Sequence, residues 1–170
     1  MSSATAATTP GRGGKFLTFA LGREEYGIPI LKVREIIGCM EVTAVPRSAA
    51  YVKGVINLRG QVIPVIDLRA KFAMETVAAT EETCIVVVEI IEAERKLSTG
   101  LVVDRVKEVL NIAADCVEDA PDLGATVDSH FILGMGKVGQ AVKILLDIDQ
   151  VLVGTEAREL SAIASQKAAA

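Results

Sequence analysis

The chain has 170 residues, of which 51% are hydrophobic and 24% charged, with a net charge of −4, one histidine and three cysteines. Because acidic and basic residues are interleaved, no concentrated cationic face is expected, which disfavours nucleic acid as a partner. The apolar runs are far shorter than the roughly 18 residues of a membrane helix. The widely spaced cysteines argue against a disulfide framework or a zinc site. We therefore expect a soluble, cytoplasmic protein without membrane insertion or bound metal.

Residues 1–14 are rich in Ser, Ala, Thr and Gly and lack the apolar centre of a secretory signal, so they are expected to form a disordered tail. Two hairpins are then predicted from apolar runs and turns, with strands at 15–21 and 25–30 and at 84–91 and 97–103. After each hairpin, apolar residues recur at helical spacing, which predicts a short helical turn. These residues are Ile30, Val33 and Ile37 in the first copy and Val103, Val106 and Leu110 in the second.

An internal repeat relates the two halves of the chain. Gly27–Ile37 aligns with Gly100–Leu110 without a gap, and Gly54–Leu68 resembles Gly134–Ile148. Each copy of the longer segment has an aspartate thirteen residues after its first glycine. A repeat of this kind constrains the whole fold, because each copy is expected to form the same supersecondary unit.

Many short strands with Gly-rich turns favour small barrels over alternating helices and strands. We therefore predict a mainly β chain with two barrel subdomains at about 15–80 and 81–152, between which strands can be exchanged. Glu156–Gln166 has a helical pattern, which predicts a C-terminal helix within residues 153–170.

No convincing catalytic constellation is present. His130 is the only histidine and lies in a loop-like stretch, so a nucleophile with a histidine base is not supported. The Gly-x-Gly-x-x-Gly match at 134–139 is not followed by a helix that could hold a phosphate. Asp67, Asp104 and Asp147 are better explained by turns at strand ends than by acid or base catalysis. We expect a protein that is not an enzyme and has no cofactor.

The segment Tyr26–Ile37, followed by Pro46 and Val52–Arg69, closely resembles the signature of the CheW family of chemotaxis coupling proteins, and the resemblance extends over residues 16–152. It implies two five-stranded barrels of SH3-like form with an apolar groove between them. It also implies a non-catalytic adaptor that binds the cytoplasmic tip of a chemoreceptor and the regulatory domain of the histidine kinase CheA. The free protein is then expected to be a monomer that is recruited to membrane-associated receptor arrays.

Carried onto this sequence, the family's receptor contacts fall on Val33, Glu35 and Arg59, with Val109 a weaker candidate. A receptor tip is a helical hairpin, and helices dock with apolar anchors in a groove and polar side chains at its rim. Val33 would supply apolar floor and the two charged residues the rim, where the arginine fork binds carboxylates with fixed geometry. The implied kinase contact falls on Glu118 and Leu123, at the outer end of a barrel.

Structural roles compete with these assignments. Glu35 and Arg59 could pair with each other, and Val33 could belong to the core. For Gly54 and Asn57, turn geometry is the preferred explanation, and Gly60 would let the same turn adopt a positive φ.

Two other functions are left open by the sequence. A ligand-binding or enzymatic domain would use the groove between the barrels and would show an enclosed pocket with converging polar groups and a perturbed titration. A regulatory fragment of a larger kinase or response-regulator fusion is disfavoured because no phosphoacceptor or nucleotide-binding segment is recognisable.

Overall fold

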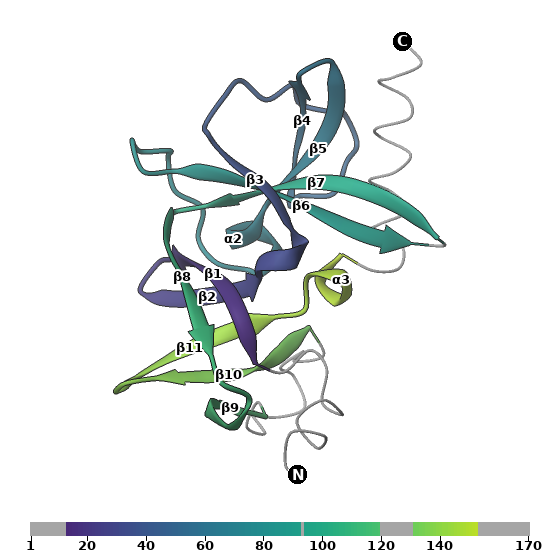
Figure 1. Ribbon diagram of the computed structural model, residues 1–170. Helices are drawn as coiled ribbons and strands as arrows, with labels where there is room; N and C mark the ends of the chain where they lie inside the picture. Colours follow the sequence, from purple (N-terminus) through teal and green to yellow (C-terminus); the bar gives the residue numbers. More distant parts are fainter. Residues whose placement is uncertain (1–12, 93, 120–130, 153–170) are drawn as a thin grey trace.

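The computed structural model describes residues 13–92, 94–119 and 131–152, and the strands among them form two sheets (Figure 1). Sheet A has the order β8-β1-β2-β11-β10-β9, and sheet B has the order β3-β6-β7-β5-β4. The strands of sheet A are β1 (Gly14–Leu21), β2 (Glu24–Pro29), β8 (Arg105–Ile112), β9 (Val117–Glu118), β10 (Ile132–Val138) and β11 (Ala141–Leu146). Those of sheet B are β3 (Val33–Gly38), β4 (Val52–Leu58), β5 (Gln61–Asp67), β6 (Cys84–Glu92) and β7 (Arg95–Val103). The predicted mainly β fold with two β subdomains is confirmed, with the two-residue β9 as a sixth strand of sheet A.

The sheets exchange strands across the middle of the chain. The first hairpin, β1–β2, lies in sheet A with β8 to β11, whereas β6 and β7 lie in sheet B with β3 to β5. A boundary near residue 80 therefore does not separate the two sheets. Two parallel pairings cause this exchange, because β11 lies beside β2 and β7 lies beside β5. The first hairpin of each copy therefore completes the sheet of the other copy.

The short helices repeat as well. Helix α2 (Leu68–Lys71) follows β5, and α3 (Ile148–Val151) follows β11. Asp67 caps the first by accepting a hydrogen bond from the Arg69 backbone N–H, and Asp147 caps the second by accepting one from that of Gln150. These two aspartates thus satisfy helix N-terminal donors, a structural role shared by both copies.

The predicted helical turns are mostly wrong. In the first copy only Ile30–Lys32 form a 3-10 helix, η1, and Val33 already begins β3, where partly buried and exposed residues alternate. In the second copy β7 and β8 are separated only by a bend at Asp104. The β-branched residues at these positions favour extended backbone, and strand pairing with β6 and β1 decided the conformation.

The largest cluster of buried residues joins the two sheets. It combines Phe19 and Ile28 of sheet A with Val86, Val88 and Leu101 of sheet B. Smaller clusters lie around Ile56 and Val87 in sheet B and around Phe16 and Leu145 in sheet A. A row of stacked rings, with centroids 5.2 to 6.0 Å apart, adds to the shared core through Phe19, Tyr26, Phe72 and Phe131. Because most of the apolar burial is shared, the two sheets stabilise each other.

The remaining short element is the 3-10 helix η2 (Ala114–Cys116) before β9. The predicted C-terminal helix and residues 1–12 of the predicted tail lie outside the described residues, and Gly14 already belongs to β1. No helix within the described part of the chain is long and apolar enough to cross a membrane.

Two buried threonines in this core are expected to respond oppositely to replacement by valine. Thr18 Oγ1 donates to the Glu108 carbonyl (2.7 Å) and accepts from the Glu108 N–H (3.2 Å) at a bulge between β1 and β8. Thr99 Oγ1 is buried without a hydrogen-bond partner. We expect Thr18→Val to lower the free energy of unfolding by about 2 kcal/mol and Thr99→Val to raise it by about 1 kcal/mol. Urea unfolding of both variants measures this, and a destabilised Thr99→Val would contradict it.

Candidate functional site

The β4–β5 turn is the most distinctive backbone feature near the predicted receptor contacts. Leu58 and Gln61 pair across a two-residue loop in which Arg59 has φ 52° and Gly60 has φ 84°. The Asn57 side chain closes the loop by accepting a hydrogen bond from the Gly60 N–H at 2.8 Å. Positive φ at both central residues matches the twist of a two-residue hairpin, but it is unfavourable for a side chain such as arginine.

Arg59 forms an ion pair with Glu35 of β3. The two residues come from opposite edges of sheet B, so the pair forms only because the sheet curls into a barrel. The Arg59 side chain is 70% exposed and that of Glu35 28% exposed. The pairing expected as a structural alternative is therefore present, and it leaves most of the Arg59 side chain accessible to a partner.

The two apolar candidates differ in burial. Val33 is partly buried and packs against the core shared by the sheets, whereas Val109 on β8 is 47% exposed. Val109 lies on sheet A, and the other three receptor candidates lie on sheet B. Ile36, which the repeat aligns with Val109, is 43% exposed on β3. The repeat thus pairs two exposed apolar residues, of which sequence reasoning singled out only Val109.

Gly54 does not lie in a turn, contrary to the expectation. It is inside β4 with φ 146°, at a register shift against β5. The backbone of Thr43 lies against β4 at this point. Its N–H donates to the Val55 carbonyl and its carbonyl accepts from the Val55 N–H, both at 2.9 Å. A Cβ at Gly54 would lie 2.0 Å from the Thr43 oxygen. The glycine thus permits the close backbone approach that covers the β4 edge of sheet B.

Of the predicted kinase contacts, Glu118 lies on the short strand β9 and Leu123 lies outside the described residues. The Lys137 ammonium is 2.6 Å from the Glu118 carboxylate, and this pair raises the pKa of Lys137. Both side chains are largely exposed. The pair is expected to add little to stability and to leave both charges available to a partner.

A bidentate ion pair lies elsewhere, between Arg69 of α2 and Asp104. The guanidinium donates to both carboxylate oxygens, at 2.8 Å and 2.6 Å, and a third nitrogen donates to the Glu75 carbonyl. The backbone N–H of Gly22 also donates to Asp104. The hydrogen bond from Arg69 is the main reason that the pKa of Asp104 is lowered, and the same bond raises the pKa of Arg69.

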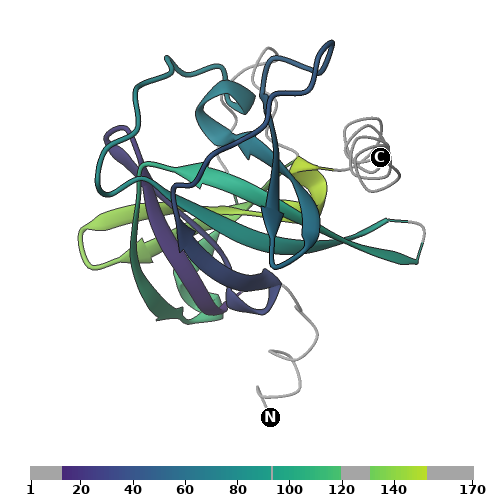
Figure 2. The ribbon, with the colours of Figure 1, turned by 90° about the horizontal axis from the view of Figure 1, so that it is seen from above.

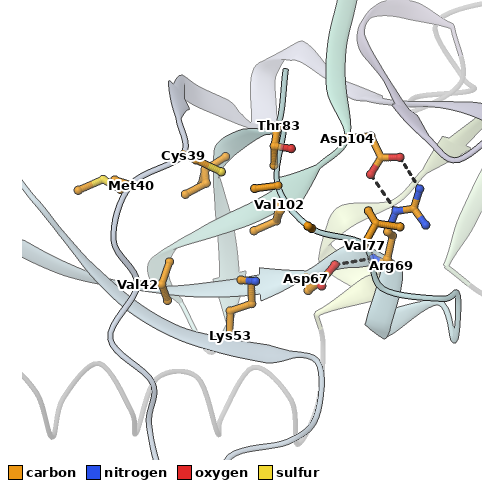
Figure 3. Close-up of a pocket in the computed structure, with 13 residues that line it drawn as sticks. Cys39, Met40, Val42, Lys53, Asp67, Arg69, Val77, Thr83, Val102 and Asp104 are labelled. Carbon is orange, nitrogen blue, oxygen red and sulfur yellow. Dashed lines mark hydrogen bonds and ion pairs between the residues drawn. The ribbon is translucent and has the colours of Figure 1, made fainter. Parts of the chain in front are cut away.

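This ion pair lies at one end of a pocket of about 230 Å³, with Cys39, Met40 and Val42 at the other end (Figure 3). An adjoining pocket of about 270 Å³ shares Asp104. Neither pocket is lined by the four predicted receptor contacts. The pocket thus has the converging charges expected of the ligand-binding alternative.

Two of these charges, Arg69 and Asp104, are nevertheless paired with each other. Both oxygens of Asp104 accept hydrogen bonds, and the low pKa keeps the carboxylate ionised, which is unsuited to an acid or base that must exchange a proton near neutral pH. No group of three or more His, Cys, Asp or Glu side chains that could hold a metal ion occurs among the described residues. The Arg69–Asp104 pair is therefore not arranged as an available acid–base pair.

Comparisons with known proteins show the family of this chain. Residues 15–156 match the family model described as the CheW-like domain. "Chemotaxis protein CheW" from Klebsiella aerogenes is 42% identical over 144 residues, which cover 85% of this chain and 84% of that protein. The protein of the same name from Treponema pallidum is 31% identical, with 86% of each chain covered. The crystal structure of the scaffolding protein TtCheW from Thermoanaerobacter tengcongensis superimposes with a TM-score of 0.74 at 31% identity, covering 85% of this chain and 95% of that one. The chain therefore belongs to the CheW-like domain family.

Proposed function

We propose that this protein is a non-catalytic chemotaxis adaptor that couples the cytoplasmic tip of a chemoreceptor to the regulatory domain of the histidine kinase CheA. Membership of the CheW-like family supports this function, as do relatives named chemotaxis and scaffolding proteins. In this proposal the protein is a cytoplasmic monomer when free and joins receptor arrays at the membrane. Val33, Glu35, Arg59 and Val109 serve the receptor, and Glu118 and Leu123 serve the kinase.

The strained backbone of Arg59 is the observation that carries the proposal. A left-handed conformation costs a residue other than glycine about 1 kcal/mol, and an exposed ion pair such as that with Glu35 offsets only about 0 to 1 kcal/mol. At the equivalent turn of the second copy the residue is Gly139, with φ 61°. Arginine thus occupies a position where glycine would serve the fold at least as well. A binding role for its exposed side chain explains its presence.

Replacing Arg59 with glycine tests this reasoning. We expect Arg59→Gly to leave the melting temperature unchanged or slightly raised, because it relieves the strained φ as it removes the ion pair. We also expect binding to a receptor-tip fragment, measured by isothermal titration calorimetry, to weaken by about tenfold or more, which is the loss expected when an arginine that carries much of the binding energy is removed.

Glu94 provides a matched control. It has φ 66° at the tip of the β6–β7 hairpin, which projects away from the rest of the molecule (Figure 2). Glu94→Gly should relieve similar strain without changing receptor affinity. If Arg59→Gly lowered the melting temperature and left receptor affinity unchanged, Arg59 would be structural and the proposed receptor contact would be wrong.

A further inference from the structure

The chain crosses between the sheets at two places in its described part, and an ion pair lies at each. The first crossing runs from β2 to β3 through η1, and the second runs from β7 to β8 at Asp104. Lys32 of η1 pairs with Asp149 of α3, and Asp104 pairs with Arg69 of α2. Each pair therefore joins a crossing segment to the short helix that ends one of the repeat copies.

At the second crossing, Asp104 holds parts of both sheets. Its carboxylate binds Arg69, which follows β5 of sheet B, and it accepts from the Gly22 N–H in the β1–β2 turn of sheet A. Its own backbone N–H donates to the Ala20 carbonyl at 3.1 Å. The Arg69 and Asp104 side chains are only 14% and 27% exposed, so solvent weakens this pair less than a surface pair.

The first crossing has the corresponding arrangement. The Lys32 ammonium is 2.5 Å from the Asp149 carboxylate on α3, which follows β11 of sheet A. The other oxygen of Asp149 accepts from the Ile91 N–H of β6, in sheet B, at 3.4 Å. Asp149 therefore has polar contacts to sheet B both through η1 and directly through β6.

The repeat relates one partner of each pair, whereas Lys32 aligns with Arg105, one residue after Asp104. Arg69 and Asp149 occupy the same position, two residues after the aspartate that caps each helix, and their charges are opposite. Apolar packing between the sheets is not directional, whereas ion pairs on both crossings resist a change in the angle between the sheets. We propose that Lys32–Asp149 and Arg69–Asp104 act as positioning pairs that fix this angle for receptor binding.

This inference rests on the proposed function, because the receptor candidates are divided between the sheets. Val33, Glu35 and Arg59 lie on sheet B and Val109 on sheet A. A partner that contacts both sheets binds more tightly when their angle is already set, since less ordering remains for the binding step.

The more exposed pair allows a test by charge reversal. Lys32→Glu places two carboxylates face to face, and the double variant Lys32→Glu with Asp149→Lys restores opposite charges with a similar combined side-chain length. The angle is followed by pulsed electron paramagnetic resonance between spin labels introduced by Lys53→Cys on sheet B and Val142→Cys on sheet A. For these samples the native cysteines are replaced by serine.

We expect Lys32→Glu to shift or broaden the distance distribution and to weaken receptor-tip binding at least about fivefold, and the double variant to restore both. Ile56→Val, a conservative change in the core of sheet B, controls for lost stability and should change neither. An unchanged distance distribution in Lys32→Glu, or affinity that does not recover in the double variant, would overturn the inference. If the unaltered protein bound no receptor tip, the proposed function would fail, while the distances alone would still test whether the pair fixes the angle.

Discussion

Replacing Gly54 with alanine is expected to lower the free energy of unfolding by about 3 kcal/mol or more, among the larger effects of a single substitution. The new Cβ would lie 2.0 Å from the Thr43 oxygen, far inside van der Waals contact. Relief requires the Thr43 segment to move, which breaks its two hydrogen bonds with Val55. The φ of 146° adds strain that alanine cannot avoid without moving the strand.

Gly139→Ala separates the clash from the backbone strain. Gly139 also has a positive φ, 61°, but a Cβ there would meet nothing within 4 Å. We expect this control to cost only about 1 kcal/mol. Chemical denaturation of both variants measures the difference, and equal losses would show that the approach of Thr43 to β4 is not a close contact.

The second large effect is expected for Arg69→Ala. Removing one partner of a fully buried ion pair costs about 3–5 kcal/mol, and because this pair is partly exposed we expect about 2 kcal/mol. The neighbouring Arg105 is an internal control, since it lies 3.7 Å from Glu82 and both side chains are well exposed. Arg105→Ala should change the free energy of unfolding by less than about 0.5 kcal/mol. Similar losses in the two variants would contradict a special role for Arg69.

Acid should remove the contribution of the Arg69–Asp104 pair. The pKa of Asp104 is lowered in the folded state, so its contribution is fully present above the unfolded value of about 3.9 and is lost as pH falls through the folded value. Glu25 behaves similarly, because Lys143 lowers its pKa, and total stability therefore reports both groups. The difference in unfolding free energy between the unaltered protein and Asp104→Asn isolates Asp104. This difference should be constant above about pH 5 and should shrink below about pH 4; a difference independent of pH would contradict the assignment.

Much of the fold could be predicted from alternation and from the repeat. The two hairpins begin and end within a few residues of their expected positions, because strand pairing and apolar alternation agree there. The prediction of helical turns failed because the apolar spacing around Val33 and Val106 is compatible with a helix as well as with a strand. Only pairing with distant strands decides between the two. Exchange of hairpins between the sheets is likewise a long-range property that no local pattern encodes.

The candidate site was only partly predictable. The sequence allowed Glu35 and Arg59 to pair, and they do, but the positive φ of Arg59 depends on the turn geometry. The Arg69–Asp104 pair was missed because its residues are 35 positions apart and Asp104 was explained by a turn at a strand end. The repeat places Arg69 opposite Asp149, but it does not align their partners, so it could not have identified the pair.

Reconstitution of the protein with its two proposed partners tests coupling most directly. A receptor-tip fragment and the regulatory domain of CheA would be mixed with and without this protein, and the masses of the complexes measured by size-exclusion chromatography with light scattering. We predict that the receptor fragment and the regulatory domain elute together, in a complex whose mass includes all three components, when this protein is present. Without it, the two should elute separately. A protein that bound neither partner at concentrations well above those of the array would contradict the adaptor function.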